Sequence, residues 1–361
     1  INHDDLIFLP LGGSGEIGMN ANLYHYKGRW LMIDLGISFP DDTMPGVDVV
    51  LPDLRFIEER SENLEAIILT HAHEDHFGAI PYLWERLQVP VYGTAFTLAL
   101  LRRKLAEARL DVHIPMHEIE YNIDYNFGPF SVELVSMTHS IPDPAALILR
   151  TPEGVVLHTG DWKFDATPML GEDADKARLR ALGDEGVMAL IGDSTNAMVP
   201  GHTPSEAVAC AGLTKVIAEA ENMVAVTCFA SNVARIESII TAASANNRSV
   251  CIAGRALNRT ISAAKEVGYL RDIPDFVPES DASLIPRENL VIICTGSQGE
   301  SRAAMARIAN GMHEQISLNA GDTVIFSSRK IPGNEQAIGR VQDALLRGRV
   351  HLVTDEEADV H

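Results

Sequence analysis

The feature that most constrains this chain is a cluster of histidines and acids directly after a short apolar run. Ala66-Ile67-Ile68-Leu69 is followed by Thr70-His71-Ala72-His73-Glu74-Asp75-His76, in a chain that has only 13 histidines. The apolar run predicts a buried strand, so the cluster lies at the C-terminal end of that strand. Imidazole and carboxylate groups bind zinc and similar divalent ions. We therefore interpret the cluster as a metal site rather than a polar surface loop.

The spacing inside the cluster predicts two ions. His71 and His73 are two positions apart on an extended segment, so both can point toward one ion. Asp75 and His76 fall where the chain must turn, and they can reach a second ion beside the first.

Two later segments repeat the pattern of an apolar strand followed by a ligand type. His139 follows the predicted strand at 130–137, and Asp161 follows Val155-Val156-Leu157-His158. Gly160 permits a close approach of the backbone to a metal. In company with the histidine cluster, His139 and Asp161 become candidate ligands.

Composition places the chain among globular proteins of one or two domains. Its 361 residues can hold two domains, or one large domain with an insertion. No run approaches the roughly 18 apolar residues of a membrane span, and the first residues lack a secretory signal, so we expect a cytoplasmic protein without a membrane anchor. The four cysteines show no Cys-x-x-Cys pair, which favours buried reduced thiols: Cys210, Cys228, Cys251 and Cys294.

The net charge of −21 argues at first against a nucleic-acid substrate, because such proteins usually carry a basic surface. The charge is unevenly distributed. Residues 225–349 carry 14 lysines and arginines against 12 acids, whereas the rest of the chain carries 15 against 38. Bound divalent cations would also reverse the local sign at a metal site. A polyanionic substrate is therefore not excluded.

The pattern of predicted elements changes near Ser205. The preceding part is rich in strands with interspersed helices, whereas the following part alternates helix and strand. Such alternation predicts a parallel sheet between helices, with ligands at the carboxyl ends of its strands. The polar and basic residues expected at that edge are Ser231, Asn232, Arg255, Gly296, Ser297 and Arg329.

The set of motifs resembles the metallo-β-lactamase fold family and, more narrowly, its β-CASP nuclease branch of ribonucleases J. The resemblance runs along nearly the whole chain. Beside the metal motifs, it is carried by the segments at 11–20, Phe39-Pro40-Asp41, 160–165, Gly192-Asp193-Ser194-Thr195-Asn196, 295–300 and Ile331-Pro332-Gly333-Asn334. It implies an αββα sandwich at residues 1–204 and an inserted α/β β-CASP domain at 205–348, whose parallel sheet is flanked by helices. Residues 349–361 would begin the return to the first domain.

The resemblance also implies roles for the candidate ligands. One ion would be held by His71, His73 and His139, a second by Asp75 and His76, and Asp161 would bridge them. We expect zinc, with manganese as the alternative. Two such ions suit phosphodiester hydrolysis, in which Asp75 and His76 would be catalytic.

Other residues near these ligands are expected to support them. Asp34 and His158 would orient the imidazoles or the bridging acid, although a plain core role for His158 is equally compatible with the sequence. Asp193 matches an acid of the first β-CASP motif and would assist proton transfer or orient a ligand. Glu74 matches no ligand position, and we expect it to be exposed.

The expected substrate is RNA. The family acts from a 5′-monophosphate end in the 5′-to-3′ direction and also cuts internally, in RNA maturation and decay. Ser231 and Asn232 could donate to a phosphate, Arg255 and Arg329 could neutralise one, and the amides of 296–299 could form an anion nest. Each of these residues could equally be a helix cap or a solvated charge.

The chain departs from the family pattern at its end. The family continues into further segments that complete the second metal site and add a C-terminal domain. We therefore expect a piece of a longer protein, as Ile1 in place of Met also suggests, with a weakly held second ion and impaired activity. The full-length protein is expected to form a homo-oligomer, either a dimer or a tetramer.

Two alternatives remain open from the sequence. One is a small-molecule hydrolase of the same superfamily, which the α/β second half disfavours. The other is a catalytically silent RNA-binding subunit, which the set of six ligands disfavours.

Overall fold

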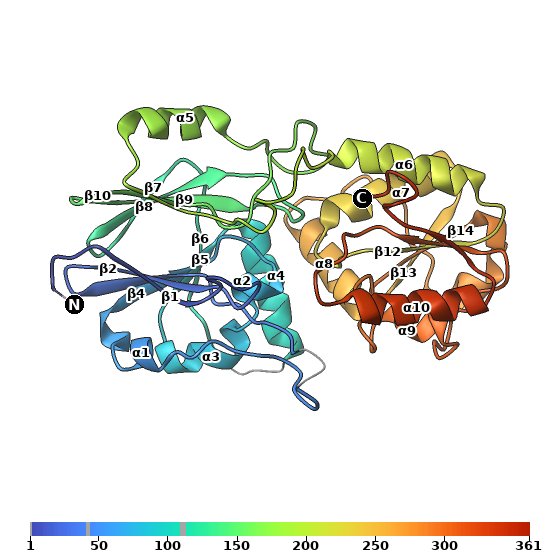
Figure 1. The fold of residues 1–361 in the computed structure, drawn as a ribbon, viewed down its shortest axis with the longest axis horizontal. Helices are drawn as coiled ribbons and strands as arrows, with labels where there is room; N and C mark the ends of the chain where they lie inside the picture. Colours follow the sequence, from blue (N-terminus) through green and yellow to red (C-terminus); the bar gives the residue numbers. More distant parts are fainter. Residues whose placement is uncertain (1, 41–43, 109–112) are drawn as a thin grey trace. The chain divides into compact units, whose positions relative to one another are not determined.

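The chain folds into two compact units in the computed structural model, which describes residues 2–40, 44–108 and 113–361. Ile1 and Asp41, the last residue of one quoted motif, lie outside these ranges. The first unit comprises Ile1–Phe164 and Gly171–His202, and the second comprises Asp165–Leu170 and Thr203–His361 (Figure 1).

Two sheets form the middle of the first unit. The first sheet contains, in spatial order, β1 (Ile7–Gly12), β2 (Ala21–Tyr26), β3 (Arg29–Ile33), β4 (Leu64–Ile68), β5 (Val91–Gly93) and β6 (Met116–Glu118). The second contains β11 (Ala189–Ile191), β10 (Gly154–His158), β9 (Ala145–Thr151), β8 (Phe130–Ser136) and β7 (Asp124–Phe127). The sheets pack face to face, because one buried cluster draws side chains from both, including Leu31, Ile68, Val132 and Leu147.

Helices cover the outer faces of these sheets, which gives the expected αββα sandwich. The helices α1 (Arg55–Glu58), α3 (Ile80–Leu87) and α4 (Ala95–Glu107) lie on the side of the first sheet, and α5 (Lys176–Glu185) covers the second (Figure 1). Leu182 of α5 packs on Val135 and Ile148 and is fully buried. The strand β2 is buried at all six of its residues, of which only Asn22 and His25 are polar.

The second unit contains a fully parallel sheet, as the helix and strand alternation predicts. Its order is β13 (Ser249–Ala253), β14 (Leu290–Cys294), β12 (Val224–Thr227), β15 (Thr323–Phe326) and β16 (His351–Val353). The helices are α6 (Glu206–Glu219), α7 (Val233–Ala245), α8 (Arg255–Glu266), α9 (Ala304–Ala309) and α10 (Glu335–Arg347). The helices α6 and α7 lie on one side of the sheet, and α9 and α10 lie on the other (Figure 1).

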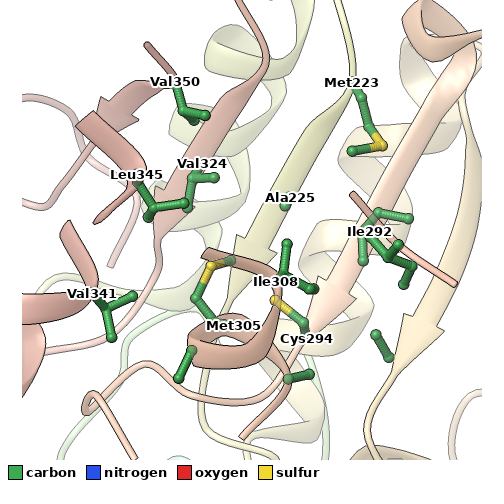
Figure 2. Close-up of a cluster of buried hydrophobic side chains, with 14 of the residues drawn as sticks. Met223, Ala225, Ile292, Cys294, Met305, Ile308, Val324, Val341, Leu345 and Val350 are labelled. Atoms are coloured by element: carbon green, nitrogen blue, oxygen red, sulfur yellow. The ribbon is translucent and has the colours of Figure 1, made fainter. Parts of the chain in front are cut away.

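Side chains between the sheet and α9 and α10 form the main core of the second unit. Figure 2 shows Met305 and Ile308 of α9 and Leu345 of α10 against the sheet residues Ile292 and Val324. All five are at most 3% exposed, so this face of the sheet is sealed by helix side chains.

Two segments join the second unit although the sequence pattern places them elsewhere. Residues 165–170 belong with the second unit rather than with residues 1–164. Residues 349–361, expected at the start of a return to the first domain, also belong to it, because β16 pairs with β15 in parallel. The sequence of a three-residue strand does not indicate which sheet the strand will join.

Candidate metal centre

The candidate ligands lie at the ends of three strands of the first unit. In each case a buried strand stops and a polar residue follows within a few positions, so the ligand side chains leave the sandwich at the same edge. They are His71, His73, Asp75 and His76 after β4, His139 after β8, and Asp161 after β10. Asp75 and His76 belong to α2 (Glu74–Phe77), a single helical turn that starts directly after His73.

Four of these residues form the first ligand group. His73 Nδ1 lies 3.0 Å from His71 Nε2 and 3.2 Å from His139 Nε2. Asp161 Oδ2 lies 3.7 Å from His139 Nε2. One ligand atom from each residue falls within 4.8 Å of all the others. Three imidazoles and one carboxylate make a donor set that suits a divalent ion of the zinc type.

Asp161 also belongs to a second ligand group, with Asp75 and His76. His76 Nε2 lies 3.3 Å from Asp161 Oδ1 and 3.6 Å from Asp75 Oδ2. The two carboxylate oxygens of Asp161 thus face different groups, which is the arrangement a bridging ligand needs. The described residues offer four ligands to the first group and three to the second.

Asp34 fixes the orientation of His76. It follows β3 and is fully buried, and its Oδ2 lies 2.7 Å from His76 Nδ1. Thr70 holds the carboxylate from the other side, because its amide donates to Oδ1 and its hydroxyl to Oδ2, each at 2.8 Å. With Nδ1 of His76 bonded to Asp34, Nε2 is the nitrogen turned toward Asp161.

Burial and charge divide the histidines into two kinds. Burial lowers the pKa of His73 to about 3 and of His139 to about 4, and it also lowers that of His71, so these rings are neutral and have a lone pair for a metal. Burial acts the same way on His76, but the charges of Asp161, Asp75 and Asp34 outweigh it and raise its pKa.

Asp161 remains a carboxylate despite its burial. Burial alone would raise its pKa, but the charge and hydrogen bond of His76, with smaller contributions from His71 and His139, lower it well below the usual range. Asp161 is therefore ionised at neutral pH, as a metal ligand must be.

The structure places His158 and Asp193 outside both ligand groups. His158 Nδ1 lies 2.9 Å from the hydroxyl of the buried Tyr24, and burial lowers the pKa of His158 to about 4. Asp193 follows β11, its amide donates to Thr159 Oγ1, and its carboxylate accepts a hydrogen bond from the amide of Thr195. Both lie within the first unit.

Glu74 is not exposed as expected. Its side chain is half-buried and accepts a hydrogen bond from Lys104 Nζ of α4. The pair ties α2, which carries two candidate ligands, to a longer helix. This pair could not be predicted from the sequence, because Glu74 and Lys104 are 30 positions apart.

The candidate RNA-binding residues gather at the carboxyl edge of the parallel sheet of the second unit. They follow β12, β13, β14 and β15, and parallel strands end at one edge. Arg255 and Arg329 are exposed. The side chain of Asn232 accepts a hydrogen bond from Arg235 N at 3.0 Å. Asn232 therefore caps α7, which is one of the two roles that the sequence left open for it. Ser231 is half-buried in the same loop.

The loop after β14 does not form the expected nest of free amides. Gln298 N donates to Glu300 Oε2 at 3.0 Å, and Gly299 N donates to the carbonyl of Gly296 at 3.2 Å. The nest prediction is therefore wrong for two of the four amides. Ser297, by contrast, is 2% exposed, and its hydroxyl has no hydrogen-bond partner among the described residues.

Asn20 is a polar residue beside the ligand groups to which the sequence assigned no role. Its side-chain Nδ2 lies 3.1 Å from the carbonyl oxygen of Asp75 and 3.1 Å from His76 Nε2. It ends the glycine-rich segment at 11–20, and its position in that motif was the only sequence signal.

Comparison with known proteins places the chain in a family. Residues 15–202 match the model of the metallo-beta-lactamase superfamily, and residues 221–345 match the model of the ribonuclease J beta-CASP domain. The chain belongs to the ribonuclease J family. Both the αββα sandwich and the parallel-sheet unit are thereby accounted for.

Curated relatives in the ribonuclease J family match almost all of this chain. It is 48% identical to ribonuclease J of Sinorhizobium meliloti, over 99% of this chain and 64% of the relative. It is 44% identical to ribonuclease J of Mycolicibacterium smegmatis, over 97% of this chain and 63% of the relative. It is 37% identical to ribonuclease J2 of Bacillus subtilis, over 98% of this chain and 64% of the relative. The chain thus spans just under two thirds of the length of these relatives.

A solved structure shares the fold at low sequence identity. A protein of unknown function from Enterococcus faecalis V583 aligns over 97% of this chain and 88% of its own, with a TM-score of 0.67 and 17% identity. Family membership rests on the sequence matches, and this structure supports the fold alone.

Proposed function

We propose that the protein is a metal-dependent ribonuclease that hydrolyses RNA phosphodiester bonds. The observation that carries the proposal is the position of Asp161, which faces both ligand groups, in a chain whose second unit matches the ribonuclease J beta-CASP domain. In a two-metal hydrolase, adjacent ions stabilise the attacking and leaving oxygens, and a carboxylate that faces both ligand groups can hold the ions side by side. The relatives named ribonuclease J support RNA as the substrate.

The donor sets fit two divalent ions of unequal affinity. His71, His73, His139 and Asp161 would hold the first, and Asp75, His76 and Asp161 the second. We propose zinc as the native metal, with manganese as the alternative, because mixed imidazole and carboxylate sets bind both. Three protein ligands bind more weakly than four, so the second ion is expected to be held less tightly.

The residues of the chain have separate tasks in this proposal. When bound, the two ions supply a nucleophilic water at neutral pH and positive charge opposite the scissile phosphate. Asp34 holds His76 with Nε2 toward the reacting edge, and Asp161 provides a permanently ionised carboxylate between the groups. We propose that Asp193 assists proton transfer to the leaving group, and that His158 acts through packing with Tyr24.

The substrate end would be recognised by the second unit. We propose a 5′-to-3′ exonuclease that prefers 5′-monophosphate ends and also cuts internally. Arg255 and Arg329 would neutralise the terminal phosphate, and Ser231 and the unpartnered hydroxyl of Ser297 would donate to it. Asn232 would position this loop as the cap of α7, and Gly296 would allow close approach.

No described helix has both the length and the apolar character needed to cross a membrane. We propose a cytoplasmic protein that forms a dimer or tetramer in its full-length form.

The decisive experiment compares RNA substrates and ligand variants. Protein in excess is incubated with 5′-monophosphorylated, 5′-triphosphorylated and circular RNA, with Mn²⁺ or Zn²⁺, and metal content is measured in parallel. We expect fastest loss of the monophosphorylated RNA, slow cutting of the circle, and no cleavage in EDTA or with His76→Ala. Unchanged cleavage by His76→Ala with two ions still bound would overturn the mechanism.

The same assay separates the alternatives. Hydrolysis of thioester or lactam substrates without RNA cleavage would favour a small-molecule hydrolase. RNA binding without bound metal and without cleavage would favour a silent RNA-binding subunit.

A further inference from the structure

A glycine-rich segment that belongs to neither ligand group reaches the second one. Residues 11–20 run from the end of β1 to the start of β2, and only the last of them, Asn20, extends a side chain to the candidate ligands. The hydrogen-bonding contacts of its Nδ2 go to Asp75 and His76. Asp75 and His76 are the two candidate ligands that belong to the second group alone.

The backbone of Asn20 is fixed on both sides. Its amide donates to the carbonyl of Asp75 at 2.9 Å, and its own carbonyl accepts from the amide of Gly36 at 2.8 Å. Gly36 lies so close to α2 that a Cβ there would meet the carbonyl oxygen of Asp75 at 1.7 Å. The three segments therefore cross at a single point, and the turn that carries Asp75 has no room to shift toward them.

The orientation of the Asn20 amide is determined by its neighbours. Nδ2 lies 3.1 Å from the carbonyl oxygen of Asp75, which can only accept, so this end of the amide must be the donor. The amide oxygen points back to Gly13, where an added Cβ would lie 2.3 Å from it. Asn20 therefore presents hydrogens, not a lone pair, to the second ligand group, and it is not itself a ligand.

The same nitrogen lies beside both ligand atoms. It is 3.5 Å from Asp75 Oδ2 and 3.1 Å from His76 Nε2. The Asp75 side chain is about one-third exposed, at 32%, and its Oδ2 also faces His76 Nε2, at 3.6 Å. Donation by Asn20 to the carbonyl and carboxylate of Asp75 restricts rotation of that side chain before any ion arrives, and it leaves the lone pair of His76 Nε2 to the ion.

We propose that Asn20 is a positioning residue for the second ligand group, which sets the affinity of the second ion without acting on the first. The proposal rests on the proposed two-metal function but concerns the ion-binding step alone. Hydrogen-bonding partners of metal ligands typically change affinity by about 10 to 100-fold. A site with only three protein ligands is expected to lose the most affinity when such a partner is removed.

The test is a titration of the metal-free protein with Mn²⁺ alone, followed through the electron paramagnetic resonance signal of the free ion. Wild type is expected to bind in two steps. In Asn20→Ala we expect the first dissociation constant to change by less than about threefold and the second to rise by at least about tenfold. Asn20→Ser, which keeps a shorter donor, is measured in the same way and stands in if the alanine variant does not fold.

A matched control is available in the second unit. Asn246 also donates through Nδ2 to two backbone carbonyls, those of Thr214 and Ala242, but its unit contains none of the ligands. Asn246→Ala should leave both binding steps unchanged. Three results would each overturn the proposal. Asn20→Ala could weaken both binding steps equally, or it could change neither dissociation constant. Wild type could also bind only one ion up to millimolar Mn²⁺.

Failure of the proposed function would give a different result. If wild type binds two ions and Asn20→Ala loses the second, but neither cleaves RNA, the positioning role stands and the ribonuclease proposal falls.

Discussion

A single glycine, Gly36, permits two backbone segments to approach closely beside the candidate metal centre. Because a Cβ on Gly36 would lie 1.7 Å from the carbonyl oxygen of Asp75 and 2.6 Å from the amide nitrogen of His76, alanine cannot fit without moving α2. We expect Gly36→Ala to lower the free energy of unfolding of the first unit by about 3 kcal/mol or more. Urea denaturation followed by tryptophan fluorescence measures it.

The control for this substitution lies in the interior of α10. A Cβ on Gly339 would meet no atom within 4 Å, and the residue does not need a positive φ. Gly339→Ala should therefore stabilise its helix by about 0.5–1 kcal/mol, measured by circular dichroism. Similar losses for the two variants would show that the close approach at Gly36 is unimportant.

The four cysteines are expected to be chemically silent in the folded protein. All are buried, and burial raises the pKa of Cys228 and of Cys251 to about 12. Since only the thiolate is nucleophilic, about one in ten thousand of the Cys228 and Cys251 side chains is reactive at pH 8. We expect no modification by iodoacetamide within minutes for native protein and four additions in guanidinium, counted by mass spectrometry. Rapid labelling of native protein would contradict the burial.

Single residues were predictable where a local pattern marks them. The candidate ligands follow apolar strands within a few positions, so the sequence singled out all six residues that the structure brings together. Asn20 was not predictable, because its partner Asp75 is 55 positions away and an amide in a glycine-rich loop has no characteristic pattern. The same holds for Lys104 and Glu74, which meet only after α4 packs against α2.

At the scale of elements, hydrophobic pattern predicted the buried strands and long helices well but not the amphipathic surface pieces. The helix α5 was missed because Leu182 is its only fully buried residue and the remainder is largely charged. The helix α3 begins only at Ile80, after Gly78 and Ala79 separate it from α2, and Pro81 lies in its first turn. The strand β7 was missed because only Phe127 of its four residues is buried.

A buried ion pair joins three elements of the first unit. Glu133 of β8 is bound by Arg178 of α5 at 2.6 and 2.8 Å and by Arg150 of β9 at 2.8 Å, and its side chain is 8% exposed. Glu133→Gln should lower the free energy of unfolding by about 1–3 kcal/mol at pH 7, because it leaves two arginines without their buried carboxylate. Glu185→Gln is the control, since the 44% exposed Glu185 contacts the same arginines and should cost under about 1 kcal/mol.

The contribution of Glu133 depends on pH in a defined direction. Hydrogen bonds from Arg178, against the opposing effect of burial, lower the pKa of Glu133 below 4.5 in the folded state. A lowered folded pKa means that the stabilisation is complete above the unfolded pKa near 4.5 and is lost as pH falls through the folded value. The difference between wild type and Glu133→Gln should therefore shrink below pH 4.5. A difference that grows on acidification would contradict the assignment.

At the scale of the whole molecule, the change of pattern near Ser205 predicted two different architectures correctly. It did not predict that residues 165–170 and 349–361 join the second unit, because tertiary pairing rather than local sequence decides where short segments pack. The two units carry separate natural probes. All three tryptophans, Trp30, Trp84 and Trp162, lie in the first unit, and all four cysteines lie in the second.

These probes test whether metal acts on one unit alone. Every candidate ligand lies in the first unit, so free metal at 100 times its dissociation constant should stabilise that unit by about 2.7 kcal/mol. Mn²⁺ is the suitable ion, because Zn²⁺ also binds thiols that unfolding exposes. In urea, we expect Mn²⁺ to raise the midpoint of the tryptophan transition while the midpoint of cysteine labelling stays unchanged. The double variant His71→Ala, His139→Ala should abolish the shift, and equal shifts of both probes would mean that the second unit shares the stabilisation that the ligands supply.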